Sequence, residues 1–174
     1  MTGKLLAGLI VVVGLGAGIL MFYLQEYAYY DAVPADAAVV ELVTFDGTQE
    51  QIVVRDFQGI DSDTSPLRYR ACFTPVNSLA MLTETYPIHD GAVPLNAPDW
   101  FECFDSQEIG AALENGTAIA FLSEFNFEYG FDRVVAVMED GRGFAWQQLN
   151  ACGEAFYNSD PLPHHCPLPP EELN

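Results

Sequence analysis

The strongest constraint on this chain is an uninterrupted apolar run near its N-terminus, LLAGLIVVVGLGAGILMFYL, over residues 5–24. The run contains no charge and no proline, and as a helix it is about 30 Å long, which matches the hydrocarbon core of a bilayer. A helix buried in a soluble core normally keeps one polar face, and this run has none. The run therefore predicts one membrane-spanning helix, with residues 1–30 as the anchor.

Charges on either side of the run predict its orientation. Lys4 precedes it, Glu26 and Asp31 follow it, and the next basic residue is Arg55. Because positive charge stays in the cytoplasm, we expect a cytoplasmic N-terminus, one pass through the inner membrane and a periplasmic C-terminal part. Aromatic rings suit the headgroup layer, and a belt of them is expected at the outer boundary of the membrane. The belt consists of Phe22, Tyr23, Tyr27, Tyr29 and Tyr30.

A cleaved signal peptide is the alternative interpretation of the same run. The apolar part of a signal peptide is about 7–15 residues long, and a cleavage site between small residues follows it closely. Here the run is longer, and the first tolerable site, Ala35-Asp36-Ala37, lies well beyond its end. These features favour an uncleaved anchor.

Two glycines within the run, Gly14 and Gly18, form a GxxxG pair, a pattern that lets another helix approach closely. Glycine is also common in membrane helices that make no such contact. Both interpretations stay open, a packing face for a partner helix and an ordinary membrane-spanning segment.

The part of the chain beyond the run is strongly acidic. Apart from Lys4, the chain has five arginines and no lysine, against 25 aspartates and glutamates. Such a surface repels nucleic acid and anionic headgroups, and it attracts cations or a basic protein. Solubility alone also explains a high net charge. We expect no nucleic-acid partner.

Four cysteines follow the run, and an even number in an oxidising compartment predicts two disulfides with three alternative pairings. The chain contains neither CxxC nor CxxCH, which argues against a redox pair and against covalent haem. Pairing of neighbours is favoured, Cys72 with Cys103 and Cys152 with Cys166. The second bridge would staple a proline-rich C-terminal strap.

The remaining sequence predicts a short tether over residues 31–37 and one periplasmic α+β domain over residues 38–174. β-rich runs, several of them flanking Asp-Gly turns, predict a mainly antiparallel sheet with strands at 38–45, 49–57, 67–73, 117–125, 132–140 and 143–149. Two short helices are expected. One begins with Thr74 as N-cap and Pro75 in its first turn, and it ends before Pro87. The other runs from Asp105 to Asn115-Gly116, with Glu108 completing a capping box.

The string PHHCP near the C-terminus offers ligands for copper or zinc, namely His164, His165 and Cys166, with His89 or a carboxylate completing the set. Adjacent residues of an extended chain point in opposite directions, so one ion does not easily bind both histidines. A disulfide at Cys166 would also occupy its sulfur. Metal binding is therefore the alternative function, and no cofactor is expected.

No motif in the sequence predicts catalysis. No serine lies in a G-x-S-x-G elbow, and no glycine-rich loop is present to hold a phosphate. His89-Asp90 has the form of an oriented imidazole, but a solvated loop histidine explains it equally well. We expect a protein that is not an enzyme.

The layout of the anchor MTGKLLAGLIVVVGLGAGILMFYLQEYAYY, a hairpin, RYRACF, APDWFECF and VVAVMEDGRGFAWQQLN resembles a family of short single-pass, N-terminally anchored envelope proteins of proteobacteria. That family has no assigned function, and the resemblance implies an anchored periplasmic domain and no site residue. The expected function is a non-catalytic accessory or interaction protein, such as a peripheral subunit or assembly factor of an inner-membrane complex, for example a respiratory one. The alternative is a periplasmic copper-handling protein that uses the His-His-Cys segment.

Overall fold

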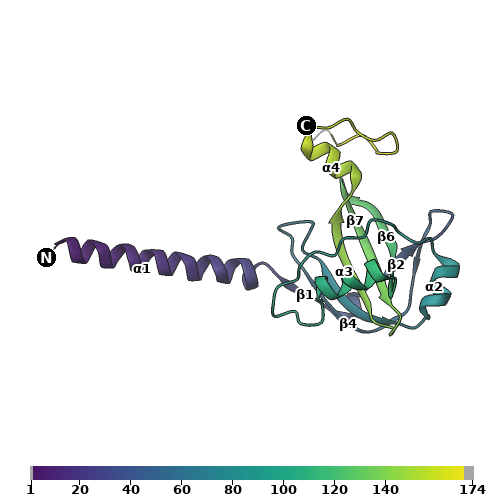
Figure 1. Cartoon of the computed structure of the whole chain (residues 1–174), viewed down its shortest axis with the longest axis horizontal. Helices are drawn as coiled ribbons and strands as arrows, with labels where there is room; N and C mark the ends of the chain where they lie inside the picture. The colour runs from purple at the N-terminus through teal and green to yellow at the C-terminus, as the bar shows by residue number, and fades with distance from the viewer. Residues whose placement is uncertain (1, 171–174) are drawn as a thin grey trace.

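The N-terminal apolar run is a single long helix that projects from a compact domain (Figure 1). The computed structural model describes residues 2–170. Helix α1 (Thr2–Tyr23) continues into a π-helical turn, η1 (Leu24–Ala28). Among the described residues, the segment Gly3–Ala28 is the one helix long and apolar enough to cross a membrane, and its apolar window is not buried. The chain thus has one candidate membrane helix.

Six strands form an antiparallel sheet in the order β1-β4-β5-β8-β7-β6. They are β1 (Asp31–Val33), β4 (Val54–Asp61), β5 (Arg70–Pro75), β6 (Ala118–Glu128), β7 (Phe131–Met138) and β8 (Gly143–Leu149). Strands β6, β7 and β8 are consecutive hairpins, as predicted. Gly130 and Gly141 form their turns with φ angles of 88° and 91°, a region that favours glycine. The predicted α+β class with an antiparallel sheet is confirmed.

Both faces of this sheet are buried. Successive side chains of a strand point to opposite faces, and the two sets belong to two separate core clusters. One face packs against α3 (Ser106–Asn115) and the loop that precedes it. The other packs against a separate hairpin, β2 (Glu41–Val43) and β3 (Gln49–Gln51), and against α2 (Leu79–Thr85). The domain therefore has three layers, with the sheet in the middle.

The caps of α3 follow the sequence signals, except for one side chain. Asp105 accepts hydrogen bonds from the backbone N–H groups of Gln107 and Glu108, and Gly116 ends the helix in the left-handed conformation. The expected capping box is incomplete because Glu108 instead forms a bidentate ion pair with Arg142, at 2.7 and 3.1 Å.

The predicted start of α2 is wrong. Thr74 and Pro75 end strand β5, where they pair with Arg55 and Val54 of β4. Ser78 is the N-cap instead, and its hydroxyl accepts a hydrogen bond from the Met81 N–H. The pairing of β5 with β4 is a long-range contact, so the local Thr-Pro signal did not decide the structure.

Three further segments differ from the prediction. The expected strand over residues 49–57 is divided between β3 in the separate hairpin and β4 in the six-stranded sheet. Within the expected tether, residues 31–33 form the edge strand β1, which pairs with residues 59–61 of β4. In the C-terminal region, residues 151–158 form a third short helix of the domain, α4 (Ala151–Asn158), which the sequence analysis did not predict. The strap is therefore confined to the residues that follow α4, 159–170 in the described part of the chain.

Both disulfides join the neighbours that the sequence argument favours. Cys72 on β5 is bonded to Cys103, which ties the loop before α3 to the sheet. Cys152 on α4 is bonded to Cys166, which ties the strap to the helix.

The junction between α1 and the domain is built from aromatic residues. The Trp100 indole N–H donates to the Glu26 carbonyl, and its ring stacks on Tyr27 at a centroid distance of 6.2 Å. The Arg68 guanidinium lies 5.2 and 5.4 Å from the ring centres of Tyr29 and Tyr30. Three tyrosines of the predicted aromatic belt therefore contact the domain itself.

Candidate functional site

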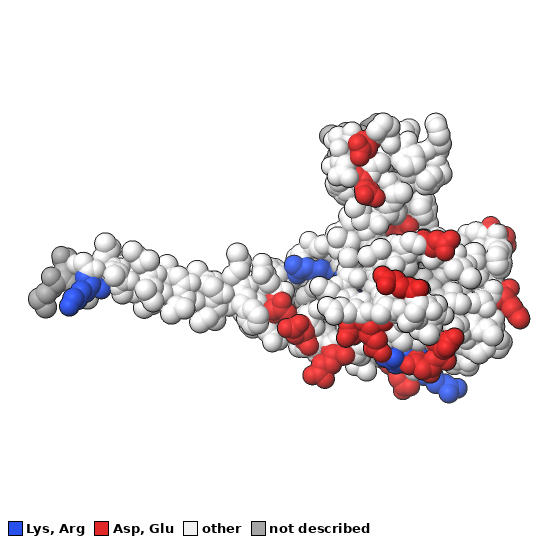
Figure 2. Space-filling model, in the orientation of Figure 1, with Lys and Arg blue, Asp and Glu red and all other residues white. Residues whose placement is uncertain are grey.

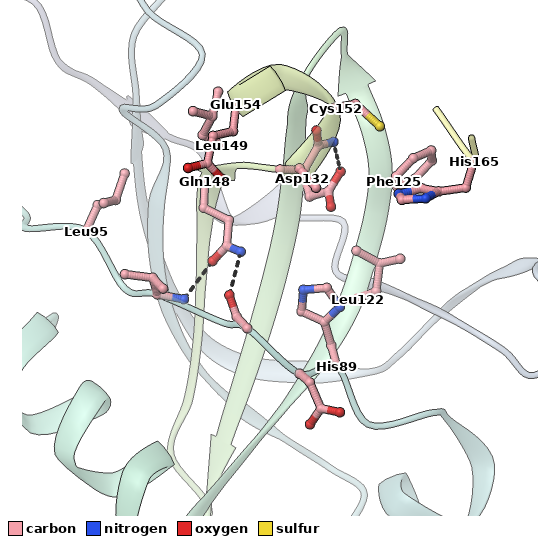
Figure 3. Close-up of a pocket in the computed structure, with 15 residues that line it drawn as sticks. His89, Leu95, Leu122, Phe125, Asp132, Gln148, Leu149, Cys152, Glu154 and His165 are labelled. Carbon is pink, nitrogen blue, oxygen red and sulfur yellow. Dashed lines mark hydrogen bonds between the residues drawn. The ribbon is translucent and has the colours of Figure 1, made fainter. Parts of the chain in front are cut away.

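A cleft lies on the α3 side of the sheet, at the end of β7 and β8 that leads into α4 (Figure 3). It has a volume of about 640 Å³, in the range of small-molecule sites. Its walls come from the loop over residues 89–95, from β6, β7 and β8, from α4 and from the strap. Its polar lining includes His89, Asp90, Asp132, Gln148, Glu154 and His165.

Asp132 is the most buried charge in this cleft, with a relative exposure of 4%. Its Oδ1 accepts hydrogen bonds from the Asn126 N–H at 2.8 Å and from the Asn150 side-chain amide at 2.6 Å. Asn150 also caps α4, since its Oδ1 accepts a hydrogen bond from the Gly153 N–H. This network fixes the orientation of the Asp132 carboxylate and joins the β6–β7 turn to α4.

The second oxygen of Asp132 is directed into the cleft, on the side of His89 (Figure 3). Among the described residues, no hydrogen bond reaches this oxygen, and no lysine, arginine or histidine lies within ion-pair distance of the carboxylate. A buried carboxylate is costly unless it is fully hydrogen-bonded or paired with a positive charge. Asp132 therefore has one oxygen bonded within the protein and one open to the cleft.

His89 is held opposite Asp132 by the edge of the sheet. Its backbone N–H donates to the Ala120 carbonyl at 2.8 Å, and the preceding residue, Ile88, bridges to Phe121. Burial lowers the pKa of His89 below its ordinary value of 6.5, although Asp132 and Asp90 act in the opposite direction. The imidazole is therefore neutral at pH 7.

Gln148 fixes the loop that forms the wall of the cleft. Its Oε1 accepts hydrogen bonds from the Val93 N–H at 2.8 Å and the Trp146 indole at 3.1 Å. Its Nε2 donates to the Gly91 carbonyl at 3.1 Å. The amide is buried, with a relative exposure of 7%, so these bonds form away from solvent and preorganise the loop.

A buried arginine holds the next part of the same loop. The Arg70 guanidinium donates to the carbonyls of Leu95 and Asn96, at 2.9 and 3.0 Å, and to two carbonyls of its own segment. Burial lowers the pKa of Arg70 to about 10, which leaves it charged at pH 7. The loop over residues 89–96 is therefore pinned to the sheet by Gln148 and Arg70.

The structure brings together two of the four predicted metal ligands, His165 and Cys166. The ligand atoms of His165 and Cys166 lie within 4.8 Å of one another and of Cys152, an arrangement that the sequence analysis did not include. His164 and His89 do not belong to this group. Because Cys152 and Cys166 form a disulfide, their sulfurs are not available as thiolate ligands in this state.

Two other sets of residues lie away from the cleft, the predicted glycine pair of α1 and two acids beside Trp100. Gly14 and Gly18 are on exposed positions of α1, and a Cβ at either would meet no described atom within 4 Å. The acids beside Trp100, Asp99 and Glu102, line a separate polar hollow of about 600 Å³ next to Glu26. Among the described residues, no serine, threonine or free cysteine lines the cleft that contains His89 and Asp90. In the second hollow, Ser106 lies in the lining together with Asp99 and Glu102.

The sequence analysis missed Asp132 and Gln148, yet their positions carried a signal. On β7, Asp132 is in phase with Val134 and Ala136, which are buried in the core against α3. On β8, Gln148 is in phase with Phe144 and Trp146, which lie in the same cluster. A polar residue at the core-facing end of a strand marks the place where the core gives way to a polar cleft.

The cleft combines a fixed carboxylate, a neutral imidazole and apolar walls, which is the chemistry of a binding site. His89 has the protonation state of a general base, and among the described residues no Ser, Thr or free Cys lines the cleft. The arrangement can hold a ligand through the fixed carboxylate and the apolar walls.

Comparison with known proteins places the domain in a family. No curated protein and no solved structure is significantly similar to the chain. The model of a family of unknown function, DUF6446, matches residues 40–167. This range covers most of the chain and includes the cleft and all four cysteines, so the chain belongs to this family of unknown function.

Proposed function

We propose that this protein is a non-catalytic accessory protein of the inner membrane, with a cytoplasmic N-terminus, an uncleaved α1 anchor and a periplasmic domain. Lys4 and the acids that follow α1 support this orientation, and two disulfides suit an oxidising compartment. The resemblance to short anchored envelope proteins of proteobacteria supports the same location. The Trp100 junction would hold the domain next to the bilayer surface.

The observation that carries the proposal is the unbalanced charge of the domain surface. Among the described residues, ion pairs engage Arg133 with Glu124, and Arg142 with Glu108 and Asp140. Arg68 and Arg70 contact rings and carbonyls instead of carboxylates. Most aspartates and glutamates in the described part of the chain therefore make no ion pair, and Figure 2 shows acidic side chains over the visible face of the domain.

An acidic surface of this kind attracts a partner with a basic periplasmic face. The proposed partner is a larger inner-membrane complex, for example a respiratory one, in which this protein is a peripheral subunit or assembly factor. Gly14 and Gly18 would supply a second contact inside the membrane, since their face of α1 is free for close helix packing.

Purification of the full-length protein in a mild detergent, with mass spectrometry of the proteins that accompany it, tests this function. Partner recovery should fall several-fold for Gly14→Ile with Gly18→Ile and should survive Gly16→Ile, which alters the opposite face of α1. Raising the salt from about 0.1 M to about 1 M should release a partner held by the domain, since exposed charges are then screened. If no membrane protein is enriched over an unrelated single-pass control, the proposal fails.

Copper handling is a second candidate, favoured by the proximity of Cys152, His165 and Cys166. After reduction of the disulfide, these residues would offer two thiolates and one imidazole, a soft set suited to Cu(I). The reduced protein should then bind Cu(I), with a loss of affinity for His165→Ala and little change for His164→Ala. Free thiols in the protein as isolated from the periplasm would favour this candidate. It would be excluded if no free thiols are found and the reduced protein does not bind Cu(I).

A further inference from the structure

The buried carboxylate of Asp132 has one oxygen that faces the cleft without a donor among residues 2–170. Its other oxygen is held by Asn126 and Asn150, so the carboxylate cannot easily turn away from the cleft. A carboxylate with a relative exposure of 4% gains more from a cationic ligand than an exposed one does, because less water competes for it. Asp132 is therefore preorganised to receive a positive charge.

The rest of the cleft is negatively charged as well, which also favours a cationic ligand. Asp90, Asp132 and Glu154 line it, and no lysine or arginine does. His89 adds no positive charge at pH 7, because burial lowers its pKa. Carboxylates in a cleft with low-dielectric walls focus a negative potential on its interior and favour cationic ligands.

The apolar walls indicate that the cation is organic. Leu122, Phe125 and Leu149 line the cleft, and the last two keep relative exposures of 46% and 39%. A hard metal ion such as Ca²⁺ requires six to eight oxygen ligands. Among the described residues, Asp132 belongs to no group of three ligating side chains whose atoms lie within 4.8 Å of one another.

We propose that this cleft binds a small organic cation, a primary ammonium group carried on an apolar body. The ammonium donates to the free oxygen of Asp132, and the apolar body packs against Leu122, Phe125 and Leu149. The Phe125 ring adds a surface that attracts cations. This ligand site is independent of the partner interaction proposed above, since the cleft is complete within one chain.

Calorimetric titration of the full-length protein in uncharged detergent micelles tests the site, with 2-phenylethylammonium as the probe. Its neutral analogue, 2-phenylethanol, has the same apolar body and controls for partitioning. We expect saturable binding of the ammonium in the low millimolar range, as suits a ligand of this size, and binding of the alcohol at least about tenfold weaker.

Two variants test the role of Asp132. Asp132→Asn removes the charge and keeps an oxygen that accepts from Asn126 and Asn150, and it should weaken ammonium binding by about tenfold or more. His89→Lys leaves Asp132 intact and places an internal ammonium opposite it, so it should abolish binding. Glu84→Gln, on α2 at the other face of the sheet, makes the same charge change as Asp132→Asn and should bind like the wild type.

Three results would overturn the proposal. They are no saturable binding by the folded wild-type protein up to about 20 mM probe, equal affinity for the ammonium and the alcohol, or unchanged affinity in both Asp132→Asn and His89→Lys. If Asp132→Asn does not fold, His89→Lys decides the question. Loss of the membrane partner described above would leave these titrations unaffected, so the two proposals fail separately.

Discussion

Gly153 in the first turn of α4 lies against Gly130 in the β6–β7 turn, with no room for a side chain between them. A Cβ added at Gly153 would lie 2.7 Å from the Gly130 Cα, 2.7 Å from the Leu149 Cδ1 and closer still to the Gly130 carbonyl oxygen. Two of these atoms belong to the backbone and cannot rotate away. We therefore expect Gly153→Ala to push α4 away from the β6–β7 turn.

The magnitude follows from two opposing effects. Replacing glycine by alanine inside a helix normally stabilises a protein by about 0.5–1 kcal/mol. Overpacking at a rigid contact costs about 1–3 kcal/mol, and the backbone contacts place this site near the upper end. Gly153→Ala should therefore lower the free energy of unfolding by about 2 kcal/mol. For a protein of this size, that corresponds to a decrease in Tm of roughly 4–8 °C.

Gly110 on α3 provides a matched control, because a Cβ there would meet its nearest neighbour, the Pro94 Cγ, at an ordinary 3.7 Å. Gly110→Ala should stabilise the domain by up to about 1 kcal/mol through helix propensity alone. Urea unfolding of the full-length protein in detergent, followed by tryptophan fluorescence with both disulfides intact, measures both variants. If Gly153→Ala is as stable as Gly110→Ala, the contact between α4 and the β6–β7 turn is wrong.

Three further perturbations test other parts of the structure. Replacing both Cys152 and Cys166 by alanine opens a loop with a sequence separation of 14, and it should lower the free energy of unfolding in urea by about 3 kcal/mol. A decrease below about 0.5 kcal/mol would indicate that the disulfide does not constrain the strap. Trp100→Phe removes the indole hydrogen bond to the Glu26 carbonyl, which is worth about 1 kcal/mol. The rate of proteolytic cleavage between α1 and the domain should therefore rise about fivefold, and an unchanged rate would contradict the junction. Because burial lowers the pKa of His89 below 6.5, the unfolded chain binds its proton more readily, and stability should fall as the pH drops below about 6.5. His89→Gln should reduce this loss between about pH 7 and pH 5, as measured by the urea midpoint, and an unchanged slope would refute the assignment.

Local signals in the sequence were sufficient wherever the decisive contact is local. The α3 boundaries follow from Asp105 and Gly116, whose backbone roles are fulfilled within one turn of the helix. The hairpins around Asp46-Gly47 and Gly141 follow from turn residues that join strands adjacent in sequence. The apolar run of α1 needs no partner in the chain at all.

Signals failed where a distant partner decides the structure. The segment 31–33 is a strand because residues 59–61 pair with it, and its own composition does not show this. Thr74-Pro75 has the form of a helix start, but the pairing of β5 with β4 extends the strand through both residues. In α4, the Asn150 side chain caps the N-terminus in the structure, but the helix is short and contains Gly153, so local propensity alone did not predict it.

The cleft depends on long-range contacts even more strongly. His89 and Asp132 are brought together by a loop bridge to β6 and by the register of β7, neither of which has a motif. What the sequence did contain was the phase of Asp132, a charge at a core-facing position of a strand. Such a charge predicts a polar feature next to the core, but not which residue lies opposite it.

The two ligand hypotheses for this domain share a wall of the cleft and differ in how they depend on the Cys152–Cys166 disulfide. Cys152 lines the cleft, and its bond to Cys166 holds the strap so that His165 also lines it. Cu(I) binding requires both thiols to be reduced, which removes the covalent link that positions the strap. Ammonium binding uses Asp132, which is fixed by Asn126 and Asn150 and does not depend on the disulfide for its orientation. Titrating one sample with both probes before and after reduction therefore separates the hypotheses, because copper binding should appear on reduction while the contact with Asp132 should persist.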